Sequence, residues 1–437
     1  MDNFFHSVTL DKELCKGCIN CIKRCPTEAI RVRNGKARIM PERCIDCGEC
    51  IRICPHHAKK PIYDPLSILE NGCYNIALPA PSLYAQFNNL DEVDILLQAL
   101  RDLGFDDIYE VAKAAEIVSD ITRHLMKTGK LTKPVISSAC PAVTRLIRVR
   151  FPNLIDNVLP VNSPAELAAR LAKKKAQKET GLPVDKIKAI FISPCAAKVT
   201  AVKMPLGTEK SNIDYVVAIK EIYPRLLPLM QQVKTPRVSS ETGKIGVGWG
   251  ISEGESSALL NLNYLAADGI ENVIKVLEEV EDEKLQKLDF IELNACSGGC
   301  VGGVLTVENP YIARTRMKKL KKSLPVALNH ITREIPKEAQ FDEELTFSPV
   351  LTLDEDLSKA MDKLQQIEEI TARLPGLDCG SCGAPTCRAL AEDVVRGYGS
   401  ESDCIYKYKE QMDSIFHQMS KLQGYTPEVL RQDEKKK

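Results

Sequence analysis

Cysteine is the residue type whose number and spacing in this sequence most clearly indicate chemistry. The 437-residue chain contains 17 cysteines but only six histidines and one tryptophan. Thiolates are soft ligands that select zinc, copper(I) or iron–sulfur clusters, whereas carboxylates suit hard ions such as Mg²⁺ and Ca²⁺. Sixteen of the cysteines form four groups of four. The sequence therefore predicts several thiolate-rich metal sites.

Two of the groups lie near the start of the chain and repeat one pattern, C-x2-C-x2-C-x3-C followed by proline. The first repeat contains Cys15, Cys18, Cys21 and Cys25, and the second contains Cys44, Cys47, Cys50 and Cys54. This doubled run is typical of two-cluster bacterial ferredoxins, in which the fourth cysteine of each run binds the other cluster. We expect one [4Fe–4S] cluster on Cys15, Cys18, Cys21 and Cys54, and a second on Cys44, Cys47, Cys50 and Cys25. Zinc ribbons are disfavoured because they separate two C-x2-C knuckles by a dozen or more residues.

The third group is spread along the chain, and its members follow short strand-like runs. Cys140 follows residues 135–136, Cys195 follows residues 189–192, and Cys296 and Cys300 follow residues 290–293. Ligands of open α/β sheets gather at the carboxyl ends of the strands, so these loops can converge into a third thiolate site. A buried structural cysteine is the alternative at any one position. That alternative explains poorly why all four positions share one strand-to-loop pattern.

The fourth group, Cys379, Cys382, Cys387 and Cys404, has the spacing C-x2-C-x4-C-x16-C. Four thiolates suit either an iron–sulfur cluster or zinc. The neighbouring Gly380, Gly383 and Pro385 favour a tight loop around a cluster. We expect a [4Fe–4S] cluster here and keep zinc as the alternative.

Helices and strands that could position these loops alternate between about residue 60 and the fourth group. Apolar residues recur at helical spacing from Val93 to Leu103, and Gly104 follows as a stop signal. Ser163 and Glu166 form a candidate N-cap and capping-box acid of a helix that continues to Gly181. Helices that alternate with short strands predict an α/β fold with a largely parallel sheet.

Charge and hydropathy exclude several classes of function. Lys plus Arg and Asp plus Glu both number 59, so the formal net charge is zero and a general nucleic-acid binder is disfavoured. No stretch approaches 18 uninterrupted apolar residues, and the first residues lack the pattern of a signal peptide. We therefore expect a cytoplasmic protein with neither a nucleic-acid nor a membrane partner. Thiols stay reduced in the cytoplasm, which favours metal ligands over disulfides.

The loops of the third group are ISSACPAV, SPCAAK and ELNACSGGCVGG, and they follow a two-cluster ferredoxin segment. In this combination they resemble the three H-cluster loops of the [FeFe]-hydrogenase large-subunit family. The resemblance implies that Cys140, Cys195, Cys296 and Cys300 hold a [4Fe–4S] cluster. It further implies that Cys300 bridges this cluster to a diiron subsite with CO, CN and a bridging dithiolate, while Lys198 bonds a cyanide ligand and Pro79 touches the cofactor. The fourth group resembles the single [4Fe–4S] module at the end of sensory-type hydrogenases.

Several residues depart from the pattern of the catalytic members of that family. Ala139 stands where those members carry a proton-relaying cysteine, and a methyl group cannot carry a proton. Ser193 and Asn294 replace methionines that pack against the diiron site, which implies a more polar cofactor pocket. Ser119 and Thr122 stand where the family places the relay carboxylates. The nearby acids Glu116, Asp120, Glu253 and Glu255 could form a substitute route, and their alternative role is that of solvated surface charges.

The resemblance and the patterns together imply three domains. We expect a two-[4Fe–4S] ferredoxin-like α+β domain at 1–62 and a hydrogenase-like H-cluster domain at 63–345, mainly parallel α/β in two lobes. A small helical [4Fe–4S] module with flanking helices should cover 346–437. The last helix carries apolar residues at three-four spacing: Ile405, Tyr408, Met412, Ile415, Met419 and Leu422. This spacing predicts a coiled-coil seam against a second copy, giving a homodimer, or against a partner helix, whereas packing within the module is the alternative.

Two functions from different classes fit these observations. In the first, the protein is an [FeFe]-hydrogenase of low turnover that binds H2, or oxidises it slowly and reversibly, as a H2 or redox sensor. Electrons would then pass through the [4Fe–4S] clusters to a redox partner or a signalling protein such as a kinase or phosphatase. In the second, it is a non-catalytic iron–sulfur scaffold or assembly protein without the diiron subsite. Lys198 and the doubled ferredoxin run favour the first function, whereas the loss of the relay residue at Ala139 keeps the second open.

Overall fold

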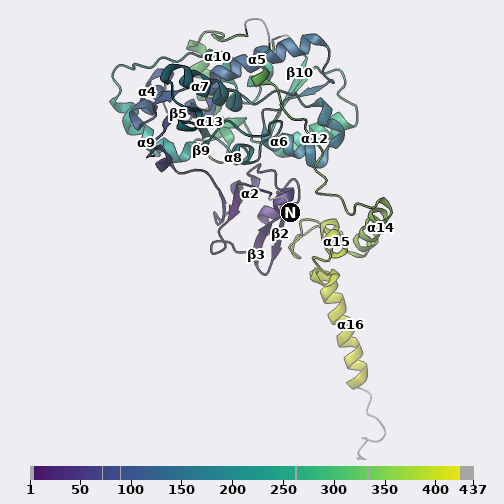
Figure 1. Ribbon diagram of the computed structural model, residues 1–437. Coiled ribbons are helices and arrows are strands. Elements are labelled where there is room, and N and C mark those ends of the chain that lie inside the picture. Colours follow the sequence, from purple (N-terminus) through teal and green to yellow (C-terminus); the bar gives the residue numbers. More distant parts are fainter. Residues whose placement is uncertain (1–3, 71, 89, 261–262, 332–334, 424–437) are drawn as a thin grey trace, which may run out of the picture. The chain divides into compact units, whose positions relative to one another are not determined.

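The chain folds into two compact units in the computed structural model, which describes residues 4–70, 72–88, 90–260, 263–331 and 335–423, without the side chains of 422 and 423. The larger unit contains the described residues up to Leu14 and those from Met40 to Val350. The smaller unit contains residues 15–39 and the described residues from Leu351 onward (Figure 1). The first ferredoxin-like repeat therefore shares a unit with the C-terminal segment. These units differ from the three predicted domains, because contacts and not chain order decide which segments pack together.

Two parallel sheets form the framework of the larger unit. One has the strand order β6-β5-β8-β9, and the other has the order β10-β11-β7. The strands are β5 (Tyr74–Pro79), β6 (Asp107–Ile108), β7 (Val135–Ile136), β8 (Ile187–Ser193), β9 (Tyr215–Ala218), β10 (Tyr264–Asp268) and β11 (Phe290–Asn294). Every neighbouring pair in both sheets is parallel. The predicted α/β fold and the three strands expected before the cysteine loops are confirmed.

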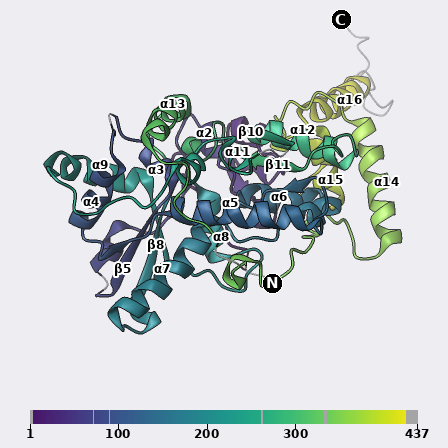
Figure 2. The same ribbon diagram turned by 90° about the horizontal axis from the view of Figure 1, so that it is seen from above.

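The four-stranded sheet is covered by helices on both faces (Figure 2). Ile76 and Leu78 of β5 pack with α5 (Val111–Thr128) and α7 (Pro164–Thr180). Ala77 points to the other face and packs with α4 (Val93–Leu103) and α9 (Ile219–Gln232). A strand buried on both faces reads as a continuous apolar run, which is what β5 and β8 show. Helices on both faces leave the strand ends free to carry the functional loops.

Two helices begin and end as their sequences predict. Gly104 follows α4 with φ of 116°, a conformation that is accessible to glycine. The hydroxyl of Ser163 accepts a hydrogen bond from the N–H of Glu166 at the start of α7, and Gly181 ends that helix. The Glu166 carboxylate, however, does not complete a capping box. It accepts hydrogen bonds from the Asn212 N–H at 2.7 Å and from the Ser211 hydroxyl at 2.7 Å.

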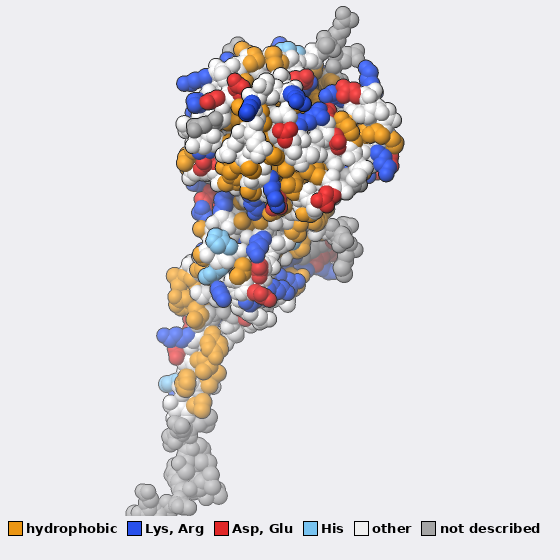
Figure 3. All heavy atoms as spheres, turned by 90° about the vertical axis from the view of Figure 1, so that its left-hand side faces the viewer, with side chains coloured by type: hydrophobic (Ala, Val, Ile, Leu, Met, Phe, Trp, Pro, Cys, Tyr) orange, Lys and Arg blue, Asp and Glu red, His pale blue; other side chains and the backbone are white. Residues whose placement is uncertain are grey.

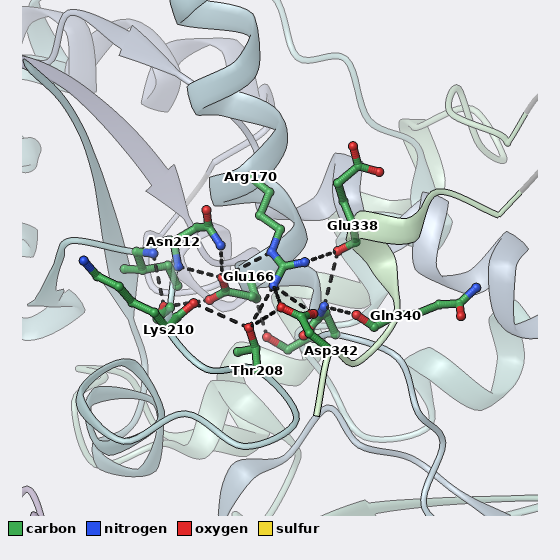
Figure 4. A network of polar contacts seen from close by, with 12 residues as sticks. Glu166, Arg170, Thr208, Lys210, Asn212, Glu338, Gln340 and Asp342 are labelled. Carbon is green, nitrogen blue, oxygen red and sulfur yellow. Dashed lines mark hydrogen bonds and ion pairs between the residues drawn. The ribbon is translucent and has the colours of Figure 1, made fainter. Parts of the chain in front are cut away.

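A polar network joins α7 to two distant segments of the larger unit (Figure 4). Arg170 donates to the carbonyl of Glu338 at 2.8 Å and to the hydroxyl of Thr208 at 2.9 Å. Thr208 in turn donates to the carboxylate of Asp342 at 3.0 Å. These hydrogen bonds fix the segments on the two sides of α7.

The three-stranded sheet packs its apolar residues against α6 (Pro141–Arg150) and α12 (Ile270–Glu281). Ile136 of β7 and Ile291 and Leu293 of β11 lie in one buried cluster with residues of both helices. The cysteines of the third group sit just beyond the strands of the two sheets. Their backbones are thus held by elements that are themselves buried.

The second ferredoxin-like repeat packs within the larger unit. Its strand β4 (Lys59–Pro61) pairs antiparallel with β1 (Val8–Leu10), and α2 (Glu49–Arg52) contains its third cysteine, Cys50. Asp46 accepts hydrogen bonds from the N–H groups of Ser7 and Val8 and from the hydroxyl of Thr200 in α8 (Ala196–Lys203). This buried carboxylate therefore ties the repeat to the helix that follows Cys195.

The smaller unit combines the first repeat with C-terminal helices. The first repeat contributes α1 (Asn20–Lys23) and the antiparallel pair β2 (Ile30–Arg33) and β3 (Lys36–Ile39). Its C-terminal part contains α14 (Leu357–Arg373), α15 (Cys387–Val395) and α16 (Ile405–Gln423). Ile367, Ile370 and Leu390 belong to the apolar cluster between α14 and α15. The expected helical C-terminal module is confirmed.

The apolar face of α16 is largely exposed in the described part of the chain, as the row of apolar side chains along the helix in Figure 3 shows. Ile405, Tyr408, Ile415 and Met419 expose 49–58% of their surface. Packing within the module therefore does not cover this seam. The described side chains of the seam keep the three-four spacing of a self-complementary coiled coil. Association with a second copy stays a prediction. Among the described residues, no helix is both long and apolar enough to span a membrane.

We expect that replacing Met412 and Ile415 with Glu abolishes dimerisation. Charges in the seam would remove its apolar contact, while the thermal stability of the monomer should change little because the face is exposed. Light scattering measures the mass, and Ser414→Glu on the same helix is the matched control. A mass that is the same for the double variant and the wild type would contradict the seam.

Candidate metal and catalytic centre

The third group of cysteines comes together at the carboxyl ends of three strands of the larger unit. Cys140 lies at the N-cap of α6 after β7, and Cys195 at the N-cap of α8 after β8. Cys296 follows β11, and Cys300 begins the short helix η5 (Cys300–Gly302). Burial, together with the charges of Cys140 and Cys296, raises the pKa of Cys300 to about 12. Such mutual effects require the thiols to be close neighbours.

Close backbone contacts hold the loops of this group together. A Cβ at Gly303 would come within 2.0 Å of the carbonyl oxygen of Pro194, which precedes Cys195. A Cβ at Gly299, where φ is 88°, would come within 2.3 Å of the Ser252 nitrogen. Glycine is therefore needed at both positions. Four thiols gathered in this way fit the ligation of a [4Fe–4S] cluster.

The second ferredoxin-like repeat reaches this centre through Arg52. Its guanidinium donates to the carbonyl of Gly302 at 2.7 Å and to the carboxylate of Glu49 at 2.6 Å. Burial alone would lower the pKa of Arg52, but the charges of Cys296 and Glu49 raise it above its usual range. Arg52 thus joins α2 to the loop of Cys296 and Cys300 and keeps a positive charge beside the thiolates.

A cavity lies beside Cys300 and brings together several of the residues that the sequence singled out. Its lining includes Pro81, Ala139, Lys198, Glu255, Glu292, Asn294 and Cys300. Lys198 donates to the carbonyl of Ala139 at 3.2 Å, and its charge acts to lower the pKa of both Cys195 and Cys300. The cavity is therefore bounded by a cation, a thiol and two acids.

Two of the expected cofactor contacts lie elsewhere. Pro79 is the last residue of β5 and pairs with Ile192 in the sheet, and Pro81, two residues later, is the proline of this segment that lines the cavity. The hydroxyl of Ser193 accepts a hydrogen bond from the Cys195 N–H at 3.2 Å and donates to its carbonyl at 3.1 Å. Ser193 therefore shapes the Cys195 loop and does not line the cavity, whereas Asn294 does line it.

The acids at the cavity are Glu255 and Glu292. The Ser137 hydroxyl donates to Glu255 at 2.6 Å, and burial, with the nearby charge of Glu292, raises the pKa of Glu255 to about 8. Glu292 accepts from the N–H of Ser256 at 2.8 Å and from the amide of Asn294 at 2.9 Å, and burial raises its pKa. Glu292 was not predicted from the sequence. The sequence ELNAC could have indicated it, because Glu292 and Asn294 are alternate residues of one strand and such residues share one face.

The other proposed relay residues have different roles. Glu253 is exposed, accepts a hydrogen bond from the Tyr264 hydroxyl at 3.2 Å, and is not part of the cavity lining. The hydroxyls of Ser119 and Thr122 donate back to carbonyls of α5.

The buried Glu116 accepts hydrogen bonds from the N–H groups of Gly243 and Leu328, so it joins separate segments instead of facing solvent. Asp120 pairs with Arg123 at 2.9 Å. Of the acids in the proposed route, Glu255 is the one at the cavity.

The remaining cysteine groups are divided between the two units. In the smaller unit, Cys404 is buried and Cys387 begins α15. Burial raises the pKa of Cys382, and the charges of Cys404 and Cys379 add to this effect, as expected for neighbouring thiols. The first ferredoxin-like repeat lies in the smaller unit and the second lies in the larger. The exchange of fourth ligands between the two repeats stays a prediction.

We expect the fourth group to bind a [4Fe–4S] cluster and not zinc. Cys387→Ser should then lower the iron content of anaerobically reconstituted protein by about four atoms per chain. Cys73→Ser, which changes the cysteine outside the four groups, is the matched control and should keep all the iron. Metal analysis that finds zinc in place of this iron would contradict the assignment.

Three family models match separate stretches of the chain. The family described as iron only hydrogenase large subunit, C-terminal domain, matches residues 74–227 and 227–304, more than half of the chain. A 4Fe-4S dicluster domain matches residues 7–55, and a putative Fe-S cluster family matches residues 374–406.

Curated relatives are distant. Iron hydrogenase 1 of Clostridium pasteurianum is 23% identical over 74% of this chain and 69% of its own length. The NADP-reducing hydrogenase subunit HndD of Solidesulfovibrio fructosivorans is 24% identical over 47% of this chain, which spans 44% of that relative. The cytosolic Fe-S cluster assembly factor nar1 of Aspergillus terreus is 33% identical over 19% of this chain and 14% of its own length.

Among solved structures, an apo form of a variant of the [FeFe]-hydrogenase HydA1 from Chlamydomonas reinhardtii is 15% identical with a TM-score of 0.48. The match covers 64% of this chain and 95% of that one. The family match and the convergent thiols agree in placing a hydrogenase-like domain between two iron–sulfur segments. The chain belongs to the iron-only hydrogenase large-subunit family, as an iron–sulfur protein related to the [FeFe]-hydrogenases.

Proposed function

We propose that this chain binds a diiron subsite at Cys300 and turns over H2 slowly, as a H2 or redox sensor. The observation that carries the proposal is the cavity beside Cys300, which Lys198 and Asn294 line together with two buried acids. A scaffold that only holds iron–sulfur clusters would need no such cavity. The nar1-like relative and Ala139 support the alternative, an assembly protein without the diiron subsite.

The residues at the cavity suit the group that the family uses. When bound, the diiron subsite supplies the redox chemistry by which H2 is split or formed. Cys300 would hold it beside the four-thiolate centre, and Lys198 offers an ammonium donor for a small anionic ligand. Pro81 and Asn294 bound the space around it. Lys198 is itself oriented by the Ala139 carbonyl, so the backbone at 139 keeps a role although its side chain cannot carry a proton.

Proton handling falls to the buried acids in this proposal. Glu255 is protonated at neutral pH because its pKa is raised to about 8, and a general acid or base works best with a pKa near the working pH. Ser137 links Glu255 to the loop of Ala139, since its hydroxyl donates to Glu255 and accepts from the Ala139 N–H at 3.1 Å. Glu292 lies beside them as a second acceptor. The route therefore replaces the Ser119 and Thr122 positions with Glu255 and Glu292.

Glu255→Gln should lower H2 evolution by one to two orders of magnitude, because the amide cannot exchange a proton with the cavity. It should also change the pH dependence of unfolding. The folded protein keeps the Glu255 proton up to about pH 8, whereas an unfolded Glu loses it near its ordinary pKa of about 4.3. Stability should therefore fall as pH rises between these values, and the variant should lose this slope.

The exposed Glu253→Gln is the matched control for both measurements. We measure H2 turnover of the fully loaded protein and the stability to denaturation at several pH values. In both measurements the control should match the wild type. A Glu255→Gln variant that keeps both wild-type turnover and the wild-type pH slope would show that protons pass elsewhere.

Cys300→Ser should abolish retention of the diiron subsite and leave the ferredoxin-like clusters intact. Infrared spectra after loading with the diiron cofactor report this directly, because bound CO and CN absorb where protein does not. Cys387→Ser, in the other unit, is the control and should keep the CO and CN bands. Bands that survive unchanged in Cys300→Ser would refute the assignment of the bridging thiol.

Ala139→Cys should raise H2 turnover, but only in part. A positioned proton-transfer group contributes roughly 10²–10⁴-fold to rate, and a thiol at 139 would restore one such group. Ser119 and Thr122 still lack carboxylates, so the outer part of that route stays incomplete. The comparison uses H2 evolution from a reduced dye, with Ala139→Ser as control. Native turnover already as fast as that of a dedicated hydrogenase would contradict a sensory role.

A further inference from the structure

The loop that carries the fourth cysteine group contacts the first ferredoxin-like repeat within the smaller unit. Donors of that repeat satisfy the carbonyls of this loop. Lys23 donates to the carbonyls of Asp378 and Pro385, the latter at 2.9 Å, and Arg33 donates to the Cys382 carbonyl at 3.0 Å. The N–H of Val32 in β2 donates to the Gly383 carbonyl at 2.8 Å. The two thiolate-bearing segments are thus joined through their backbones.

A buried ion pair fixes the same contact. Arg31 of β2 donates to both carboxylate oxygens of Asp393 in α15, at 3.0 and 2.7 Å, and Arg33 reaches Asp393 at 2.7 Å. The Arg31 and Asp393 side chains are only 6% and 5% exposed. Charges this deeply buried are tolerated when paired, and losing one partner leaves the other uncompensated. Arg373–Glu401, within the C-terminal part alone, is far more exposed at 53% and 31%.

The shape of the contact depends on glycine. Gly383 has φ of 83°, and a Cβ there would lie 2.0 Å from the Val32 carbonyl oxygen. At Gly380 a Cβ would meet the side chains of Ile19 and Ile22 at 3.5 Å. The cysteine loop can therefore lie directly against β2 only because position 383 has no side chain.

Basic side chains of the first repeat also face the thiols of the fourth group. The charge of Lys23 acts to lower the pKa of Cys379, and that of Arg33 acts to lower the pKa of Cys382. Positive charge beside thiolates stabilises an anionic cluster and tunes its potential. The first repeat thus contributes to the environment of the C-terminal site as well as to its own.

We propose that Arg31 and Asp393 are positioning residues that lock the C-terminal cysteine module onto the first ferredoxin-like repeat, so that one electron passes between their clusters inside the chain. In that step the cluster on the first repeat is oxidised and the C-terminal cluster is reduced, and no bond or proton is transferred. The proposal needs the two [4Fe–4S] clusters. It does not depend on the diiron subsite or on H2.

The wild-type protein itself tests the proximity. In dithionite-reduced full-length protein, the C-terminal cluster should speed the electron-spin relaxation of the first-repeat cluster. The power needed to saturate that signal should therefore be several-fold higher in the wild type than in Cys387→Ser, which lacks the C-terminal cluster. Equal saturation in the two proteins would overturn the proposal.

Asp393→Asn tests the lock, with Glu401→Gln as the matched control in the same module. We expect Asp393→Asn to remove the relaxation enhancement and to speed hydrogen exchange of the Val32 N–H at least tenfold, while Glu401→Gln changes neither. Gly383→Ala should act like Asp393→Asn by a different route, through the clash with Val32. Wild-type relaxation and wild-type exchange in both Asp393→Asn and Gly383→Ala would overturn the role of these residues. If a variant loses its C-terminal iron, the comparison of wild type with Cys387→Ser still decides the proximity.

Discussion

Convergence of four thiols from three separate loops is the constraint on which the rest of this structure depends. Thiolates repel one another, so they gather only where the backbone leaves no alternative and a metal cluster can take their charge. The strands β7, β8 and β11 end at this place, and Gly299 and Gly303 allow the loops to touch. Arg52 adds a positive charge from the second ferredoxin-like repeat. The ferredoxin-like segment is therefore part of the centre's electrostatics and more than a separate electron carrier.

The same convergence creates a buried cavity whose chemistry differs from its surroundings. Glu255 and Glu292 are both buried there, and this burial raises the pKa of each acid. Lys198 supplies the opposing charge from the loop of Cys195. A site of this kind can hold a proton near neutral pH without a cysteine at position 139. The lower flux that we expect suits a sensor, because a sensor needs occupancy and not turnover.

Much of the fold could be predicted from the sequence because local patterns decide it. The four cysteine groups, the strands before the loops and the ends of α4 and α7 depend on spacing, apolar runs and caps that neighbouring residues set. Contacts between distant segments could not be predicted in this way. Glu292 lines the cavity beside Glu255, which a different element supplies, and Pro81 lines it instead of Pro79 because the strand continues to Pro79.

The division of the chain into two units also depends on contacts between distant segments. The chain order of Arg31 and Asp393 gives no sign that they form one buried pair, so local patterns do not indicate that the first ferredoxin-like repeat shares a unit with the C-terminal segment. Each cysteine group is local or set by strand ends, whereas the connection between groups depends on side chains from hundreds of residues away. Local spacing can therefore indicate a single site, whereas it carries no information on how the sites are coupled.

The most direct test of the account is reduction of the iron–sulfur clusters by H2 itself. Protein loaded with the diiron cofactor, oxidised and then placed under H2 without any dye, would be followed by its visible absorption and by the EPR signals of reduced [4Fe–4S] clusters. The account predicts slow but complete reduction in the wild type and none in Cys300→Ser or under argon. Clusters that stay oxidised under H2 in fully loaded wild-type protein would contradict it and favour the scaffold function.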